Sequence, residues 1–260
     1  MSGENLHYDE SFIRFLEEMW GDGYLSPGGA AEVGRLLEGI DLTGKKVLDI
    51  GCGSGGITAG LAKDFGASKV IGVDVEEPVC SRALQKAIDL GVADRVEIRQ
   101  ISPDYPMPFE TDSFDIVFSK DSIVHIPDKE SMCIESFRLL KPGGWFVASD
   151  WLISHDNEPS PEMKYYIKLE DLDFGMASPT RYEKALNAAG FENVSLNNRN
   201  RWYFQEAQGE LETMKNERPR FDATMGKEEI DIQVELWQAM LVVLEKGEHC
   251  PHHFRGQKPM

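Results

Sequence analysis

The stretch Lys46-Val47-Leu48-Asp49-Ile50-Gly51-Cys52-Gly53-Ser54-Gly55-Gly56 decides the fold of this chain. A mostly apolar strand pattern runs into a turn with four glycines, and residues 57–62 then have the pattern of a helix start. Glycine allows positive φ and close approach of a ligand, and the first N–H groups of a helix are unpaired. The loop also satisfies G-x-G-x-x-G, the dinucleotide fingerprint. Taken alone, it indicates a nucleoside-bearing cofactor without identifying it.

Strand and helix patterns alternate outward from this loop. Buried strands alternating with helices predict an α/β fold, with a mostly parallel sheet covered on both faces. The expected strands are 46–50, 70–73, 96–100, 114–119, 145–149, 194–196 and 253–256. The expected helices are 10–20, 30–39, 55–65, 79–90, 129–140, 178–189, 209–218 and 228–245.

The absence of repeats and low-complexity linkers favours a single domain, 1–260, in three parts. Residues 1–45 are expected to form an N-terminal helical cap, and 46–155 the cofactor-binding core. Residues 156–260 are expected to form a C-terminal half with a helical lid insertion over the strand ends, where open α/β sheets bind ligands.

Composition excludes several classes of function. A formal net charge of −18 argues against nucleic acid and anionic lipid, which require a basic surface. No segment approaches the length of a membrane span, and no signal peptide is visible, so a cytoplasmic protein is expected. The four cysteines are far apart and are interpreted as reduced thiols. The sequence leaves a monomer and a homodimer equally open.

Two acidic residues near the glycine loop are candidate cofactor ligands. Asp74 ends the next expected strand, 23 residues after Gly51, where a carboxylate can accept hydrogen bonds from both ribose hydroxyls. The alternative for Asp74 is a solvent-exposed acid at a strand end. Asp49 interrupts an apolar strand, so it needs partners, which the turn amides or a ligand ammonium can supply.

Four motifs occur in order: V-L-D-I-G-C-G-S-G-G at 47–56, G-V-D at 72–74, F-D-I-V-F-S at 114–119 and L-L-K-P-G-G at 139–144. In this series the chain resembles the class I S-adenosylmethionine-dependent methyltransferases. The resemblance implies a Rossmann-like, mostly parallel seven-stranded sheet, in which a reversed final strand is inserted beside the last parallel one. It also implies S-adenosyl-L-methionine as cofactor, with Gly51 and Gly53 at its methionine part and Asp74 at its ribose.

A narrower resemblance rests on Y-L-S-P-G-G at 24–29 and S-K-D-S-I-V-H-I at 119–126. Both motifs resemble phosphoethanolamine N-methyltransferases, and the second is also similar to sarcosine/dimethylglycine N-methyltransferases. The resemblance implies catalytic roles for Asp121, His125 and Tyr8, with His7 also close to the transfer site. The cofactor-binding residues expected on all these grounds are Tyr8, Leu25, Ser26, Asp49, Gly51, Cys52, Gly53, Asp74, Val75, Ile101, Ser102 and Lys120.

The adenine end departs from the family pattern. Ser102 stands near the position of the usual adenine-binding acid, and Pro103 has no N–H to donate. Adenine contacts are therefore expected from Ile101 and Ser102, or from Asp104.

The chemistry of an amine acceptor supports the role of His125 independently. Methyl transfer is an in-line displacement, and an ammonium substrate must first lose a proton. A histidine held by a carboxylate is a suitable base. Asp121 and His125 are four residues apart and share a face if the segment forms a helical turn. The alternative is a surface histidine beside a capping aspartate.

The features that would bind a substrate phosphate are missing. Where that family has basic and tyrosine ligands, this chain has the acidic stretch 168–174, and Met240 and Trp151 occupy two further such positions. A small zwitterionic or cationic acceptor is therefore favoured. Candidate substrate residues are the aromatics Trp151, Tyr166, Trp202 and Tyr203, for a quaternary ammonium, and Arg201, for a carboxylate.

No metal is expected, because the tract His249-Cys250-Pro251-His252-His253 lacks two separated ligand pairs and is better explained as the start of the final strand. The sequence predicts an N-methyltransferase of a small amine or amino acid, of the betaine or osmolyte type. The alternatives are an S-methyltransferase making a sulfonium osmolyte, a phosphoethanolamine N-methyltransferase and a cofactor-binding protein without catalysis.

Overall fold

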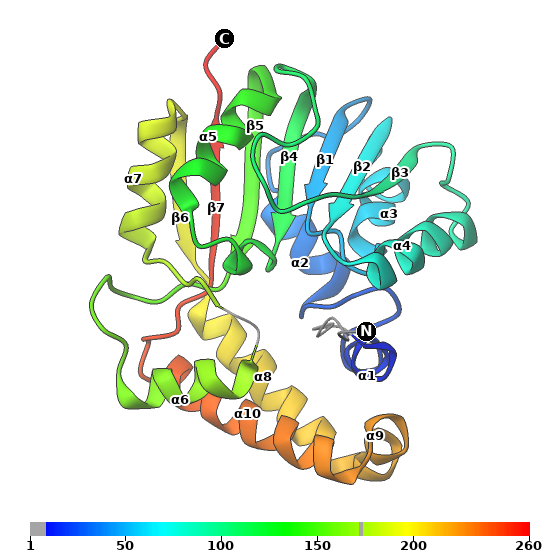
Figure 1. Cartoon of the computed structure of the whole chain (residues 1–260), viewed down its shortest axis with the longest axis vertical. Helices are drawn as coiled ribbons and strands as arrows, with labels where there is room; N and C mark the ends of the chain where they lie inside the picture. Colours follow the sequence, from blue (N-terminus) through cyan, green and yellow to red (C-terminus); the bar gives the residue numbers. More distant parts are fainter. Residues whose placement is uncertain (1–8, 172–173) are drawn as a thin grey trace, which may run out of the picture.

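A single seven-stranded sheet organises the computed structural model, which describes residues 9–171 and 174–260 (Figure 1). The strand order is β3-β2-β1-β4-β5-β7-β6. Pairs among β1 to β5 are parallel, whereas β7 is antiparallel to both of its neighbours, β5 and β6. The predicted inserted reversed strand is thereby confirmed. The strands are β1 Lys46–Ile50, β2 Lys69–Asp74, β3 Val96–Gln100, β4 Phe114–Lys120, β5 Leu140–Asp150, β6 Glu192–Asn198 and β7 His252–Gln257.

Helices cover both faces of the sheet because its strands are apolar on both sides. In β1, Val47 packs with α2, α3 and α4, whereas Leu48 packs with α5 and α7. Both residues are fully buried. The helices of the first face are α2 Gly29–Leu36, α3 Gly56–Lys63 and α4 Glu77–Asp89, and those of the second are α5 Lys129–Leu139 and α7 Pro179–Ala189.

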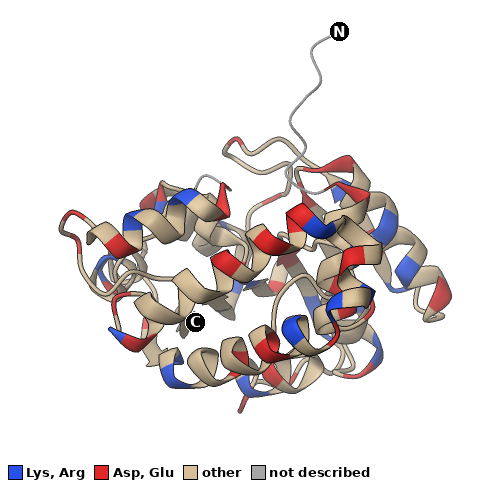
Figure 2. Ribbon diagram, turned by 90° about the horizontal axis from the view of Figure 1, so that it is seen from below, with Lys and Arg blue, Asp and Glu red and all other residues tan. Residues whose placement is uncertain are grey.

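A separate group of helices forms the lid below the carboxyl ends of the strands (Figure 1). These helices share a second apolar core that includes Phe15, Met163, Phe221 and Trp237. Figure 2 views this side and shows acidic and basic positions interspersed along the helices. The lid helices are α1 Glu10–Trp20, α6 Pro161–Glu170, α8 Asn200–Asn216, α9 Arg218–Met225 and α10 Lys227–Glu245. Among the described residues, no helix is long and apolar enough to cross a membrane.

Two boundaries differ most from the sequence expectation. Residues 141–144, expected to be a turn before the fifth strand, lie within β5, because the pairing with β4 shifts between Phe114 and Ile116 and absorbs them as an irregularity. The helix expected at 209–218 begins earlier, at Asn200. Tyr203, Ala207 and Leu211 form a buried stripe along α8, and this packing outweighs the helix-weakening effect of Gly209, about 1 kcal/mol.

Candidate active site

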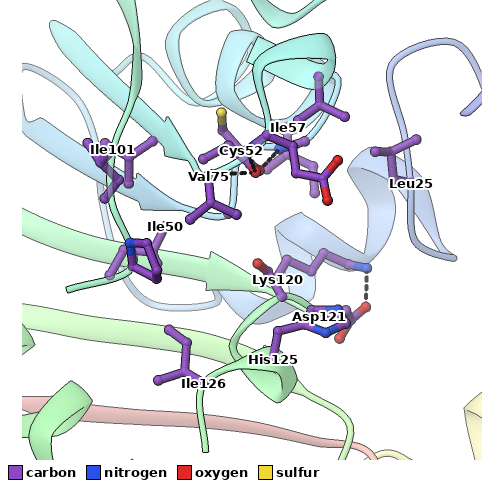
Figure 3. Close-up of a pocket in the computed structure, with 18 of the residues that line it drawn as sticks. Leu25, Ile50, Cys52, Ile57, Val75, Ile101, Lys120, Asp121, His125 and Ile126 are labelled. Atoms are coloured by element: carbon purple, nitrogen blue, oxygen red, sulfur yellow. Dashed lines mark hydrogen bonds and ion pairs between the residues drawn. The ribbon is translucent and has the colours of Figure 1, made fainter. Parts of the chain in front are cut away.

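A cavity of about 370 Å³ opens at the carboxyl ends of β1, β2 and β4. Figure 3 shows Leu25 on one side of it and Lys120, Asp121 and His125 on another. It gathers most of the predicted site residues. Those lining it are Leu25, Ser26, Gly51, Cys52, Gly53, Asp74, Val75, Ile101, Ser102, Lys120, Asp121 and His125.

The glycine loop forms part of the cavity wall through close backbone contacts. Gly51 has φ +74°, and a Cβ built on it would lie 1.7 Å from Oγ of Ser122. The Gly56 N–H donates to the Gly23 carbonyl at 2.9 Å, so the loop before α2 packs directly on the start of α3. A side chain at either glycine would push these segments apart, which explains why the turn is rich in glycine.

Asp74 is held at the end of β2 by backbone donors. Its Oδ2 accepts from the Gly53 N–H at 3.0 Å, and its Oδ1 accepts from the N–H groups of Val75 and Glu76 at 2.8 and 3.2 Å. Burial raises the pKa of Asp74 above its ordinary value, while these hydrogen bonds oppose the shift. Of the two carboxylate oxygens, Oδ2 retains a free acceptor site, which suits a hydrogen bond from a ribose hydroxyl.

Asp49 differs from the other predicted cofactor ligands, because it is buried and does not line the cavity. Its Oδ2 accepts from Oγ1 of Thr58 at 2.6 Å, so the partner comes from α3. Burial raises the pKa of Asp49 to about 7. Asp49 therefore lies under the glycine loop and supports it, without lining the cavity.

Lys120 joins the loop before α2 to the end of β4. Its buried Nζ donates to Oγ of Ser26 at 2.7 Å, to the Pro27 carbonyl at 2.9 Å and to Oδ2 of Asp121 at 2.7 Å. This ammonium is fully used by protein groups, which fix Ser26 and Asp121 on the cavity wall.

Asp121 is held by three side-chain donors, one of which is Lys120. Tyr203 donates to its Oδ2 at 2.7 Å, and Ser149 donates to its Oδ1. Burial alone would raise the pKa of Asp121, but the Lys120 ammonium and these hydrogen bonds bring it below the ordinary value. The residue has φ +54°, in the left-handed region that aspartate tolerates better than most residues.

His125 ends a short 3₁₀ helix, Ile123–His125, and lies 5.6 Å from Phe174 between ring centroids. The helical turn was expected to span Asp121 to His125, but the observed one begins only at Ile123. In the described part of the chain no hydrogen bond joins these two side chains. Both face the same cavity, and the orienting role of Asp121 toward His125 stays a prediction.

The opposite end of the cavity is lined by the loop after β3. Oγ of Ser102 donates to Oδ2 of Asp104 at 2.5 Å, so the two candidates for the adenine end lie side by side. Tyr105 and Met107 also line this end and were missed, because residues 101–113 have no periodic pattern. Ile50 and Ile57, also missed, flank the glycine loop in sequence, which was the available signal.

The model of a methyltransferase domain matches residues 41–217. The chain belongs to this methyltransferase family. It is 31% identical to phosphoethanolamine N-methyltransferase 3 of Arabidopsis thaliana, over 94% of this chain and 49% of the relative. It is 33% identical to phosphoethanolamine N-methyltransferase of Triticum aestivum, over 98% of this chain and 49% of the relative. The chain thus spans about half the length of these curated relatives.

Solved structures agree with this family. Phosphoethanolamine N-methyltransferase 2 of Haemonchus contortus, in complex with phosphomonomethylethanolamine and S-adenosylhomocysteine, superimposes with a TM-score of 0.90. It is 27% identical, over 98% of this chain and 59% of that one. A structure from Galdieria sulphuraria, assigned to the sarcosine dimethylglycine methyltransferases, gives a TM-score of 0.82 at 18% identity, over 96% and 97% of the two chains, and shows the shared fold. The predicted family and fold class are confirmed. A second structure of the Haemonchus contortus enzyme is a complex with S-adenosyl-L-methionine, the cofactor predicted for this chain.

The chain has a second, smaller cavity of about 50 Å³, enclosed mainly by lid helices and called here the lid cavity. Of the predicted substrate residues, Trp151 and Tyr203 line it. Its lining residues are Phe12, Leu16, Trp20, Leu25, Pro27, Trp151, Glu170, Tyr203, Glu206, Ala207, Glu210, Gln233, Leu236, Trp237 and Met240.

Three predicted substrate residues line neither cavity. Arg201 is exposed at the start of α8 and points to no enclosed site. Tyr166 is buried with its ring centroid 5.4 Å from that of His249. Trp202 packs against the Arg199 guanidinium, 5.0 Å from the ring centroid. Packing within the lid and beside β7 occupies Tyr166 and Trp202, whereas Arg201 is exposed to solvent, so their positions do not support direct contact with a substrate.

Two remaining predictions concern Tyr8 and metal binding. Tyr8, like His7, lies outside the described residues. Among the residues that are described, no group of three His, Cys, Asp or Glu side chains is arranged to hold a metal ion. The histidine-rich tract leads into β7 as expected, with His252 and His253 as its first residues.

Proposed function

We propose that the chain is an S-adenosylmethionine-dependent N-methyltransferase of a small, unphosphorylated amine or amino acid, giving a betaine-type product. The observation that carries the proposal is the placement of Asp121 and His125 on the wall of the same cavity as the predicted cofactor residues. A base and a fixed carboxylate beside a methyl donor suit an acceptor that must lose a proton.

The proposed reaction uses each of these groups differently. S-adenosylmethionine, when bound, supplies a methyl group on a positively charged sulfur. His125 accepts the proton that the acceptor ammonium must lose before its nitrogen can attack. Asp121 stays ionised, because its pKa is lowered, and its fixed negative charge stabilises the positive charge that develops on the nitrogen. Tyr203 and Lys120 hold that carboxylate in place.

Phosphoethanolamine is the second candidate acceptor. The relatives that carry its name match more than nine-tenths of this chain, which favours it. Neither Lys nor Arg occurs among the described residues lining the lid cavity, which disfavours it. A thioether acceptor, giving a sulfonium product, differs in that it has no proton to lose.

One experiment separates these acceptors. Formation of S-adenosylhomocysteine is followed by chromatography with glycine, sarcosine, dimethylglycine, methionine and phosphoethanolamine as acceptors. We expect turnover with the unphosphorylated amines, and His125→Ala to lower their kcat by about 100- to 1,000-fold, the contribution typical of a general base.

Asp74→Ala is the control, since it should abolish cofactor binding in calorimetry, whereas His125→Ala should retain it. Turnover of methionine that survives His125→Ala would instead establish S-methylation. Preferential turnover of phosphoethanolamine would establish the second candidate, and cofactor binding with no turnover of any acceptor would overturn the proposal.

A further inference from the structure

We propose that the lid cavity is a cation site that binds an ammonium group of the acceptor and rejects phosphate. The identification of the occupant as part of the methyl acceptor rests on the proposed function. The site itself rests on the walls, the charge and the position of the lid cavity.

Aromatic rings form the walls of this site. Trp20 and Trp237 lie with ring centroids 6.2 Å apart, and both indole N–H groups donate to Glu210, at 2.6 and 2.8 Å. One carboxylate therefore fixes the orientation of two rings contributed by α1 and α10. Trp151 and Tyr203 add aromatic rings from the end of β5 and from α8. Ring faces attract ammonium ions.

The lining is acidic. Glu170, Glu206 and Glu210 line the cavity. Burial raises the pKa of Glu170 to about 7 and also raises that of Glu210, so these carboxyl groups are harder to ionise here than in water. A bound ammonium would supply the missing counter-charge and favour their ionised forms. Lys120 lies near enough to lower the pKa of Glu210, but its ammonium is already bonded to Ser26, Pro27 and Asp121. A phosphate placed here would be repelled at short range.

Polar groups of the cavity have unused capacity for a ligand. The Glu206 carboxylate has no hydrogen-bond or ion-pair partner in 9–171 and 174–260. Over the same residues, Nε1 of Trp151 and Oε1 of Gln233 are buried without a partner. Buried polar atoms are normally satisfied, so these atoms indicate a place where a polar ligand or water completes the structure.

Size and position agree with an ammonium head group. A cavity needs a volume of roughly 10–15 Å³ to hold one water molecule. The lid cavity, at about 50 Å³, therefore accommodates about four heavy atoms, the number in a trimethylammonium group. Leu25 lines both cavities, and Tyr203 of the lid cavity donates to Asp121 of the cofactor cavity at 2.7 Å. The lid cavity thus lies beside the proposed site of methyl transfer, and the acceptor nitrogen moves from it to His125 before its proton is removed.

Tryptophan fluorescence tests the site without any turnover. Three of the five tryptophans of the chain, Trp20, Trp151 and Trp237, line the cavity. We expect saturable quenching by tetramethylammonium chloride, and no saturable change with sodium chloride of equal ionic strength or with inorganic phosphate. Glu206→Gln should weaken tetramethylammonium binding by about tenfold, the loss of one charge contact. Glu212→Gln, an exposed change on the same helix, should leave binding unchanged.

If Glu206→Gln fails to fold by circular dichroism, Glu170→Gln provides the same comparison from α6. Saturable phosphate binding, or tetramethylammonium binding unaffected by these substitutions, would overturn the cation site. The two proposals fail separately. Tetramethylammonium binding without methylation of any amine would support the cation site and contradict the proposed function. Amine methylation without tetramethylammonium binding would support the proposed function and contradict the cation site.

Discussion

At the scale of single residues, the acids near the cofactor loop differ in what holds them. Asp74 accepts three backbone N–H groups and Asp121 is bonded by Lys120, Ser149 and Tyr203, whereas Asp49 has the Thr58 hydroxyl. The pKa values of two of these aspartates are therefore shifted in opposite directions. The pKa of Asp121 is lowered and that of Asp49 is raised relative to an aspartate in water.

The raised pKa of Asp49 predicts an unusual dependence of stability on pH. The folded state binds the proton more tightly than the unfolded chain, so the free energy of unfolding falls as pH rises from about 4 to about 7. Asp49→Asn removes this titration and keeps an acceptor for Thr58. We expect it to stabilise the protein at pH 8 by an amount on the order of 3 kcal/mol, and by much less at pH 4.5. Urea unfolding at both pH values measures this, and an equal effect at both would contradict it.

The sequence predicted about half of the residues that line the cofactor cavity, because the order of strand and turn places them at one edge of the sheet. It did not predict what holds them. Tyr203 is 82 positions from Asp121, and nothing in the local pattern of α8 indicates that its hydroxyl reaches the end of β4. Arg201, on the same helix, was expected at the substrate and is exposed, since side-chain direction depends on a helix rotation that packing decides.

At the scale of elements, a buried ionic cluster ties three of them together. Glu32 of α2 is fully buried and accepts from Arg199, which precedes α8, at 2.9 Å through both of its oxygens. His253 of β7 lies 2.9 Å from the same carboxylate. Burial alone would raise the pKa of Glu32, but His253 and Arg199 lower it to about 2. The cluster thus links a sheet-covering helix, the lid and the inserted strand.

Glu32→Gln tests this link. The substitution keeps the size of the side chain but leaves the Arg199 charge buried without its counter-charge, so we expect a loss of about 3 kcal/mol in the free energy of unfolding at pH 7. Urea unfolding measures it, with Glu38→Gln, an exposed change just beyond α2, as the matched control. A loss no greater than that of the control would show that the cluster does not stabilise the fold.

Elements whose ends are marked by local sequence were easier to predict than those that depend on tertiary contacts. The bounds of β1, β3 and α1 coincide with the expected 46–50, 96–100 and 10–20, because apolar runs and turn residues mark their ends. The start of α8 was misplaced by nine residues, from the expected 209 to the observed Asn200. Its first turns are stabilised by contacts with α10 and the other lid helices, which no local pattern records.

At the scale of the whole molecule, charge is the dominant property. The net charge of −18 produces a negative potential, which attracts cations over distances comparable with the Debye length, about 10 Å at 0.1 M salt. The lid cavity lies within this field and is itself lined by carboxylates. This field would concentrate a cationic acceptor at its site.

Ionic strength should therefore separate acceptors by charge. Raising potassium chloride from roughly 20 to 300 mM should lower kcat/KM for a monocationic amine several-fold, because salt screens the long-range attraction. A zwitterionic acceptor of similar size should change much less. Initial rates of S-adenosylhomocysteine formation measure both, and equal salt dependence of the two acceptors would refute a contribution from the overall charge.

The insertion of β7 between β5 and β6 has a consequence for biosynthesis. Residues 252–257 leave the ribosome well after residues 192–198, yet they separate that strand from β5. While the chain is being made, β5 and β6 have no hydrogen-bonded neighbour at this position, and an exposed strand edge invites pairing with other chains. In the nascent protein the position between β5 and β6 must stay unoccupied until β7 is made. The sheet that holds the cofactor site is therefore completed only after the lid sequence has been translated.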